Sequence, residues 1–335
     1  MTTLPKTMRA IDHGNGGDAN CMRLVERPLP SLGDGDVLVR VFATGLNRPD
    51  ILQRAGKYAP PADASPLMGL ELSGEVVAAG SAVTRWKLGD RVCALTHGGA
   101  YAEYCAVNAL HCLPIPVGLS MLEAAALPEV FFTVWANVFQ RSQFKAGETI
   151  LIHGGSSGIG SAAIQLCKAF DAAKIIVTCS NQAKLDYCSK LGADVGINYA
   201  TEDFVAATLA ATGGRGTDVV VDMVGAPYFQ KNIDACATDG RIAQIAFQQG
   251  ARAELNMQSL MVRRLTWTGS TLRARPNAAK AAIAASLLET VWPVFARDTN
   301  ALRPQIHATF ALDKVREAHR MMESGAHFGK IVLTV

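Results

Sequence analysis

The sequence predicts an α/β fold that combines a doubly wound parallel sheet with a β-barrel domain. The first third of the chain consists of β-branched stretches separated by glycine, aspartate and proline. From Thr149 onward, strand patterns alternate with helix patterns, which is typical of parallel strands joined by crossover helices. The 335 residues are 49% hydrophobic and exceed one ordinary domain. We predict one domain over residues 1–127, a second over 128–271, and a return of the chain to the first over 272–335.

The first domain is expected to be an antiparallel, barrel-like arrangement of short strands. Ser120 followed by Glu123 forms a capping-box pattern ahead of an alanine-rich helix, so the second domain is expected to begin about there. The strand-forming segments of the first domain are MRAIDHG, GDVLVRVFATGLN, LSGEVVAAGSAV and GDRVCALTHGGAYAEYCAV.

The second domain is expected to contain six strands with helices between them. The strands are predicted at ETILIHG, AKIIVTCS, DVGINY, TDVVVDMVG, GRIAQIAF and LTWTGST, and the helices over residues 158–170, 182–191 and 227–236. A long helix over 277–295, a helix over 312–324 and the strand GKIVLTV are assigned to the first domain.

The most informative stretch is ETILIHGGSSGIGSAAIQ, where an apolar strand enters a glycine-rich turn and a small-residue helix. Such a turn seats a dinucleotide pyrophosphate on the helix N-terminus. Gly155 is expected to take the tight turn, Gly158 to leave room for phosphate, and Gly160 to let the helix approach the strand. Ser157 replaces the middle glycine of the strict motif, and its hydroxyl and amide could donate to phosphate. The predicted contacts of this turn are Gly155, Ser156, Ser157, Gly158, Ile159 and Gly160.

The end of the second strand bears on the choice of cofactor. An acidic residue there would select NAD by binding the ribose 2′-hydroxyl, but this strand ends in Ser180, and Lys184 follows. A cation can bind a 2′-phosphate, so we predict NADPH as the cofactor, with Tyr199 covering the adenine end. The alternatives are a solvated lysine beside an ordinary helix cap and an aromatic side chain used only for packing.

Charge and composition argue against two classes of partner. A net charge of +3 with 18% charged residues does not indicate nucleic-acid or membrane binding. The N-terminus lacks an apolar leader, and the longest apolar stretch, Val130–Phe139, is too short to span a bilayer. The eight cysteines include no C-x-x-C pair. We expect a soluble, cytoplasmic protein with reduced thiols.

The order of these segments resembles the medium-chain dehydrogenase/reductase superfamily, with a GroES-like domain and a Rossmann domain. GLNRPDILQRAGKY, GLELSGEV, AAALPEVFFTVW, KLGADVGINY and FGKIVL are similar to the zinc-independent quinone oxidoreductase branch of that superfamily. Where zinc-dependent relatives carry a cysteine and a histidine ligand, this chain has Asn47 and Leu70, which are not usual zinc ligands. The resemblance therefore implies that no metal is bound.

The resemblance implies a metal-free hydride transfer from NADPH to a quinone or an α,β-unsaturated carbonyl compound (an enone). Such acceptors need only positioning and stabilisation of oxyanion charge. Asn47 and Tyr58 are the candidate catalytic residues, although either could instead serve turn formation or loop packing. The remaining cofactor contacts implied by the resemblance are Thr133, Val224, Gly225, Phe247, Gly329 and Lys330, the last facing the pyrophosphate.

Two other functions remain open. An enoyl-thioester reductase would need a basic recess, for which Arg48, Arg54 and Lys57 are candidates. A cofactor-bound RNA-binding protein without turnover could use a stripe formed by Arg263–Arg264 and Arg273–Arg275, although the balanced charge makes nucleic acid unlikely as a partner. The apolar edge strand LTWTGST predicts a homodimer through pairing with its own copy, with a tetramer as the alternative.

Overall fold

The computed structural model describes residues 4–335, which form two compact units. Unit 1 comprises the chain up to residue 132 together with residues 273–335, and unit 2 comprises residues 133–272. The units thus divide after residues 132 and 272, whereas the sequence boundaries were placed after 127 and 271. The return of the C-terminal segment to the first unit positions Lys330 beside N-terminal strands.

Unit 1 is built on a seven-stranded sheet of order β14-β15-β3-β4-β5-β7, in which β6 also pairs with β3. β14 and β15 are parallel, and the other neighbours are antiparallel. This is the β-rich, GroES-like domain that the sequence predicts. Its elements are β1 (Thr7–Asp12), β2 (Arg23–Pro28), β3 (Asp36–Gly45), α1 (Arg48–Arg54), β4 (Glu71–Ala79), β5 (Arg91–Leu95), β6 (Tyr104–Asn108), β7 (Cys112–Pro114), α2 (Met121–Ala124), α3 (Pro128–Val134), α9 (Asn277–Thr290), α10 (Trp292–Arg297), β14 (Ile306–Ala311), α11 (Val315–Ser324) and β15 (Lys330–Thr334).

The predicted helix over 277–295 is two helices, because α9 ends at Thr290 and α10 restarts around Pro293. Asn277–Arg297 is also the one stretch among residues 4–335 whose length and composition would allow a membrane span. Val130–Phe139 was therefore the wrong stretch on which to test for a span. α9 buries Ile283, Ala284 and Leu287 in unit 1, as the core helix of a globular domain does.

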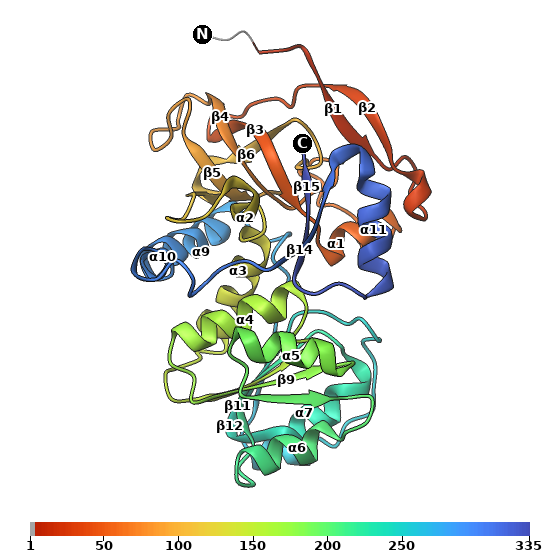
Figure 1. Cartoon of the computed structure of the whole chain (residues 1–335), viewed down its shortest axis with the longest axis vertical. Helices are drawn as coiled ribbons and strands as arrows, with labels where there is room; N and C mark the ends of the chain where they lie inside the picture. Colours follow the sequence, from red (N-terminus) through yellow and green to blue (C-terminus); the bar gives the residue numbers. More distant parts are fainter. Residues whose placement is uncertain (1–3) are drawn as a thin grey trace. The chain divides into compact units, whose positions relative to one another are not determined.

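Unit 2 is a parallel six-stranded sheet of order β10-β9-β8-β11-β12-β13. Figure 1 shows α4 and α5 on one side of its strands and α6 and α7 on the other, which is the predicted doubly wound Rossmann arrangement. Its elements are the π-helical segment η3 (Trp135–Arg141), β8 (Thr149–His153), α4 (Gly158–Ala169), β9 (Lys174–Cys179), α5 (Gln182–Leu191), β10 (Val195–Asn198), α6 (Phe204–Ala211), β11 (Thr217–Asp222), α7 (Phe229–Ala235), β12 (Cys236–Gln244), α8 (Met257–Val262) and β13 (Thr266–Gly269).

The core of unit 2 explains why its strands are almost continuously apolar. Leu151, Ile176, Val220 and Ile242 are fully buried on the central strands, since helices cover both faces of the sheet. β13 forms one edge of the sheet, as the sequence predicts. Its Trp267 ring lies 5.2 Å from the ring of Phe229, so this partly buried side chain packs against the core of its own unit.

Candidate functional site

The glycine-rich turn between β8 and α4 is shaped by three glycines with separate roles. Gly154 has a φ of 66°, so it is the residue with the left-handed backbone of the turn. The sequence analysis expected this role one position later, at Gly155. A Cβ on Gly155 would lie 2.7 Å from the Cβ of Val177 and 3.1 Å from the Sγ of Cys188. A Cβ on Gly160 would lie 2.5 Å from the carbonyl oxygens of Gly154 and Gly155. Gly155 and Gly160 are therefore required by close packing.

Ser157 completes the turn as the N-cap of α4. Its Oγ accepts a hydrogen bond from the Gly160 N–H at 3.0 Å, and its own N–H donates to the Gly154 carbonyl at 2.9 Å. The Ser157 hydroxyl thus has a role within the turn and lies 3.8 Å from the sulfur of Met223, while its predicted donation to phosphate stays a prediction. The N–H groups of Gly158 and Ile159 lack acceptors inside the helix, and with the helix dipole they form an anion-binding end.

The carboxyl ends of the other parallel strands bring further predicted residues to the same edge of the sheet. Asn198 pairs in register with Cys179, so Ser180 after β9 and Tyr199 after β10 follow neighbouring strands. Tyr199 is 44% exposed, and Phe247, which follows β12, is 53% exposed. Exposed aromatic rings at the same edge of the sheet as the glycine-rich turn offer flat apolar surfaces to a ligand.

Val224 and Gly225 follow β11 in a turn that a buried carboxylate holds. Asp222 Oδ1 accepts hydrogen bonds from the N–H groups of Val224 at 2.6 Å and Gly225 at 3.2 Å. Its Oδ2 accepts from Asn232 Nδ2 at 3.0 Å, and Asn232 Oδ1 lies 2.8 Å from His153 Nε2. Burial raises the pKa of Asp222 and lowers that of His153 to about 4. The sequence analysis assigned no role to Asn232 or His153, although His153 stands in the stretch ETILIHGGSSGIGSAAIQ, because their contact joins residues 79 positions apart in the chain.

Lys184 lies in the first turn of α5, four residues beyond Ser180. Its N–H donates to the side chain of Asn181, the N-cap of α5, at 3.0 Å. This cap fixes where the Lys184 side chain leaves the helix. Thr133 begins unit 2, and its carbonyl accepts from Asn137 Nδ2 at 2.9 Å. Its predicted contact with the nicotinamide ribose stays a prediction.

Unit 1 contains a buried polar network centred on Lys330. The Lys330 ammonium lies 2.6 Å from Asn47 Oδ1, 2.6 Å from Glu71 Oε1 and 3.1 Å from the Leu46 carbonyl. Asn47 Nδ2 donates to Glu71 Oε1 at 2.8 Å, and the Glu129 N–H donates to Glu71 Oε2 at 2.8 Å. Lys330 is 4% exposed and Glu71 is fully buried. The three N–H donors of the ammonium thus have three protein acceptors.

This network changes two predicted roles. Lys330, which follows Gly329 at the start of β15, was expected to face the pyrophosphate, but its charge is neutralised by the carboxylate of Glu71. Asn47 was expected to line the substrate site, but both ends of its amide are engaged and it is 7% exposed. Burial of the carboxylate made an internal cation necessary, which the motif alone could not reveal. Asn47 is a positioning residue in this structure.

Asp50 adds a second buried carboxylate close to the network. Its Oδ2 accepts from the Asn47 N–H at 2.9 Å and its Oδ1 from the Gly69 N–H at 3.1 Å. Burial raises the pKa of Asp50 to about 6, although these hydrogen bonds and the charges of Lys330 and Arg273 oppose the rise. The ammonium of Lys330 therefore acts on two buried carboxyl groups, those of Glu71 and Asp50.

Tyr58, the second predicted catalytic residue, lies partly exposed with its ring against an arginine side chain. It is half-buried, and the guanidinium carbon of Arg273 lies 5.7 Å from its ring centroid. Arg273 is 5% exposed, donates to Gln53 Oε1 at 2.7 Å and to the His97 carbonyl at 3.3 Å, and its Nε has no partner within residues 4–335. Burial raises the pKa of Tyr58 and lowers that of Arg273. The sequence analysis assigned no role in this site to Arg273.

Within the described part of the chain, no three His, Cys, Asp or Glu side chains lie together as a metal-binding group. The ammonium of Lys330 faces Asn47 instead, and a cation beside it would be repelled. The residues present thus do not offer a site for zinc at Asn47.

Comparison with known proteins agrees with both units. Residues 33–117 match the alcohol dehydrogenase GroES-like domain, and residues 158–287 match the family described as zinc-binding dehydrogenase. The chain is 30% identical over 304 residues to a quinone oxidoreductase-like protein 2 homolog of Nematostella vectensis, covering 90% of this chain and 82% of that protein.

The protein belongs to the zinc-independent quinone oxidoreductase branch of the medium-chain dehydrogenase/reductase superfamily. Among solved structures, a quinone oxidoreductase of Pseudomonas syringae superposes with a TM-score of 0.87 at 29% identity, covering 98% of this chain and all of that one. The protein is thus an oxidoreductase of this superfamily.

Other members of the superfamily differ in their cofactor or in their length. A NAD-dependent alcohol dehydrogenase matches with a TM-score of 0.86 at 31% identity, over 98% of this chain and all of that one. A mycobacterial protein complexed with NADPH matches at 0.84 and 26%, with the same coverage. A highly reducing polyketide synthase of Glarea lozoyensis is 31% identical over 330 residues, which are 97% of this chain but 12% of the synthase.

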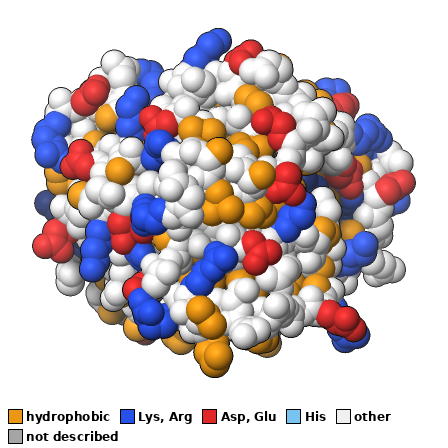
Figure 2. Space-filling model, turned by 90° about the horizontal axis from the view of Figure 1, so that it is seen from below, with side chains coloured by type: hydrophobic (Ala, Val, Ile, Leu, Met, Phe, Trp, Pro, Cys, Tyr) orange, Lys and Arg blue, Asp and Glu red, His pale blue; other side chains and the backbone are white. Residues whose placement is uncertain are grey.

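The residues suggested for alternative functions are engaged within the protein. Arg54 is 2% exposed and ion-paired with Glu323, so it does not contribute to an open basic recess. Arg263 donates to three backbone carbonyls around the end of α7, and Arg264 pairs with Asp239 at 2.7 Å. Figure 2 shows acidic and basic side chains interspersed on the face that it presents. The predicted RNA-binding stripe is therefore not formed as a free basic surface.

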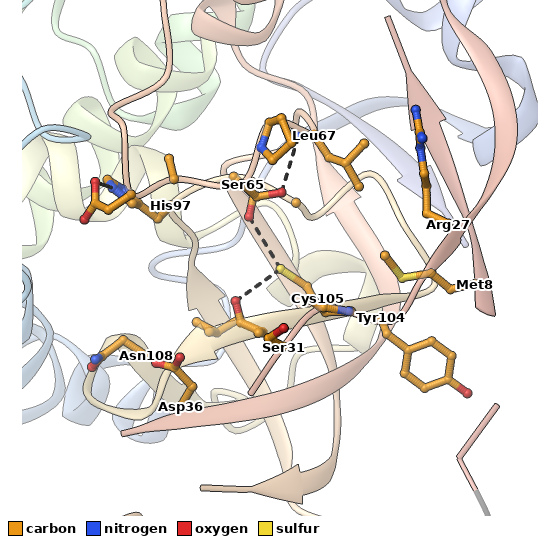
Figure 3. A pocket seen from close by; sticks show the side chains of 18 of the residues that line it. Met8, Arg27, Ser31, Asp36, Ser65, Leu67, His97, Tyr104, Cys105 and Asn108 are labelled. Carbon is orange, nitrogen blue, oxygen red and sulfur yellow. Dashed lines mark hydrogen bonds and ion pairs between the residues drawn. The ribbon is translucent and has the colours of Figure 1, made fainter. Parts of the chain in front are cut away.

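A separate cavity of about 730 Å³ lies in unit 1. Ser65, His97, Cys105 and Asn108 are among its lining residues, as Figure 3 shows. Cys105 donates to the Gly98 carbonyl at 3.5 Å. None of the residues predicted as catalytic or cofactor-binding lines this cavity.

Proposed function

We propose that the protein is an NADPH-dependent reductase of quinones or enones, acting by metal-free hydride transfer. The observation that carries the proposal is the ammonium of Lys330, 2.6 Å from Asn47, at the position where zinc-dependent relatives carry a ligand. Without a Lewis acid there, the substrate must itself accept hydride readily, as quinones and enones do. The quinone oxidoreductases to which the chain is similar support this substrate class.

The cofactor, when bound, supplies the hydride. The N–H groups of Gly158 and Ile159 would hold its pyrophosphate, and Lys184 would hold the 2′-phosphate that distinguishes NADPH from NADH. The mycobacterial neighbour complexed with NADPH supports this choice, whereas the neighbour described as NAD-dependent makes the 2′-phosphate contact the point to test. Ser180 leaves the space beside this phosphate without an acid.

Tyr58 is the residue of unit 1 that we propose for the substrate. Its hydroxyl has no protein partner among residues 4–335, so it can donate a hydrogen bond to a substrate oxygen as negative charge develops there. Arg273, against the same ring, favours negative charge close to Tyr58. Asn47 does not contact the substrate in this proposal. It holds Lys330 and the start of α1 in place.

An enoyl thioester is the second candidate substrate, favoured by the similarity to a highly reducing polyketide synthase. With Arg54 paired internally, only Arg48 and Lys57 of the suggested recess remain to bind a nucleotide-like handle. A small uncharged quinone needs no such recess.

The test is the loss of NADPH absorbance with menadione, a short enone and a crotonyl thioester, each at several concentrations. We expect menadione or the enone to give the highest kcat/KM. A clear preference for the thioester would replace the proposed substrate class. Absence of turnover with all three, in protein shown to bind NADPH, would contradict the proposal. Tyr58→Phe should lower kcat for the preferred substrate by about tenfold or more, while Tyr104→Phe, outside the predicted site, serves as a matched control.

A further inference from the structure

Two cysteine sulfurs lie in contact beneath the glycine-rich turn of unit 2. The Sγ of Cys179, at the end of β9, is 3.6 Å from the Sγ of Cys188 on α5. Cys179 is 2% exposed and Cys188 is fully buried. A disulfide has an S–S distance of about 2.05 Å, so the sulfurs need to approach by about 1.5 Å.

The pair is packed directly against the turn. Ser156, the residue after Gly155 in the turn, lies close enough to Cys179 to lower the pKa of its thiol. On the other side, Gly155 packs so closely that a Cβ there would lie 3.1 Å from the Sγ of Cys188. Movement of either sulfur therefore alters the packing of two consecutive residues of the turn.

The two cysteines also flank, in the sequence, the residue proposed to bind the 2′-phosphate. Lys184 lies between the two cysteines in the sequence, on the first turn of α5. Drawing Cys188 toward Cys179 would pull α5 toward the end of β9. The dithiol thus contacts both elements proposed to hold the phosphates of the cofactor.

We propose that Cys179 and Cys188 form a peroxide-sensitive dithiol, whose oxidation to a disulfide weakens binding of the nicotinamide dinucleotide. The proposal rests on the proposed function in one respect: the turn from Gly154 to Gly160 is taken as the site of the cofactor phosphates. Disulfide formation itself does not depend on that assignment.

The chemistry balances with hydrogen peroxide as oxidant. The thiolate of Cys179 attacks one peroxide oxygen, forming a sulfenic acid and releasing hydroxide, which takes up the proton lost from the thiol. The sulfur of Cys188 then attacks the sulfenic sulfur, forming the disulfide as its own proton and the sulfenic hydroxyl leave as water. Two thiols and one peroxide thus give one disulfide and two waters, and an added thiol reductant reverses the reaction.

The environment makes Cys179 the attacking sulfur. Hydrogen bonds from Cys188 and Ser156, together with the charge of Lys184, lower the pKa of Cys179 below its usual range. The pKa of Cys188 is raised, because its hydrogen bond to Cys179 and its burial both favour the thiol. Cys179 is therefore the sulfur that reacts with peroxide, and Cys188 is the thiol that then attacks the sulfenic acid.

Coupling of the two events must be reciprocal. If the disulfide weakens binding of the dinucleotide by a given factor, the bound dinucleotide disfavours the disulfide by the same factor. We therefore expect bound NADPH to favour the dithiol over the disulfide when the protein is equilibrated with a thiol–disulfide redox buffer. We also expect the oxidised protein to bind NADPH about tenfold more weakly, or weaker still, than the reduced protein.

Peptide mapping of the full chain tests disulfide formation directly. Trypsin cleavage after Lys174, Lys184 and Lys190 places Cys179 in peptide Ile175–Lys184 and Cys188 in peptide Leu185–Lys190. After peroxide treatment and blocking of remaining thiols, a non-reducing digest should contain these peptides as one linked species that disappears on reduction. Absence of the linked species, with both peptides recovered as blocked thiols, would overturn the proposal.

Titration of NADPH into reduced, oxidised and re-reduced protein tests the coupling. Cys179→Ser and Cys188→Ser should each abolish the effect of peroxide on the NADPH Kd, while Cys167→Ser, which removes a buried thiol of α4, should retain it. A linked species with an unchanged Kd would overturn the coupling. Failure of the reduced protein to bind any nicotinamide dinucleotide would overturn the proposed function and the coupling, but leave the linked peptide as evidence for the disulfide.

Discussion

Replacing Lys330 with methionine should destabilise the protein strongly, because Glu71 would keep a buried charge without its cation. Lys330 and Glu71 are 4% and 0% exposed, and their charged atoms lie 2.6 Å apart. Removing one partner of such a pair costs about 3–5 kcal/mol. For a domain of this size, that corresponds to a fall in Tm of roughly 6 to 20 °C. The double variant Lys330→Met with Glu71→Gln should recover most of the loss, since no buried charge is left unpaired.

Calorimetric and chemical unfolding of the four proteins in this double-mutant cycle supply the measurement. Arg9→Met is the matched control, because Arg9 pairs with Glu103 at 2.7 Å on the surface, where about 0–1 kcal/mol is expected. NADPH titration of Lys330→Met distinguishes the network from the pyrophosphate role. A destabilisation below about 1 kcal/mol, together with a Kd raised by about tenfold or more, would refute the account of Lys330 as an internal counter-ion.

Three further outcomes are expected. Lys184→Ala should remove most of a preference for NADPH over NADH of about tenfold or more, or about 1.4 kcal/mol; equal Kd values for the two cofactors in the native protein would contradict the assignment. The folded pKa of His153 is about 4, below the usual value of 6.5, so the unfolded chain binds the extra proton first and stability should fall as pH drops from about 6.5 to 4. His153→Gln should flatten that part of the stability profile by up to about 3 kcal/mol, and an unchanged profile would show that His153 does not titrate as stated. Light scattering should give twice the chain mass of 35.5 kDa. Thr266→Lys, on the exposed edge of β13, should shift the measured mass toward that of the monomer. Thr266 is a better probe than Trp267, because the Trp267 ring packs against Phe229.

The parts of the fold that the sequence predicted well are those set by local pattern. The alternation of apolar strands and helices gave the parallel sheet of unit 2, and α5 has the predicted bounds, because Asn181 caps its start and Gly192 ends it with a φ of 113°. The C-terminal strand lies in the first unit, as the sequence analysis assigned it. The break between α9 and α10 could have been anticipated from Pro293.

The parts of the site that could not be predicted depend on long-range electrostatic contacts. Lys330 and Glu71 are 259 positions apart in the chain, and nothing near either residue shows that the fold buries them together. The N-cap role of Ser157 was not predicted, because it depends on the conformation of the turn that starts at Gly154. Arg273 was considered only as part of a basic surface, since a sequence does not show which arginines are buried.

The central claim is that hydride transfer proceeds without a metal to an acceptor that is already activated. The most direct test is NADPH-dependent reduction of menadione by protein that has been exhaustively chelated and assayed for zinc. The account predicts the same kcat and the same Tm before and after chelation, with far less than one zinc per chain, because the position beside Asn47 is occupied by the Lys330 ammonium. About one zinc per chain, with activity lost on chelation and restored by zinc, would contradict it.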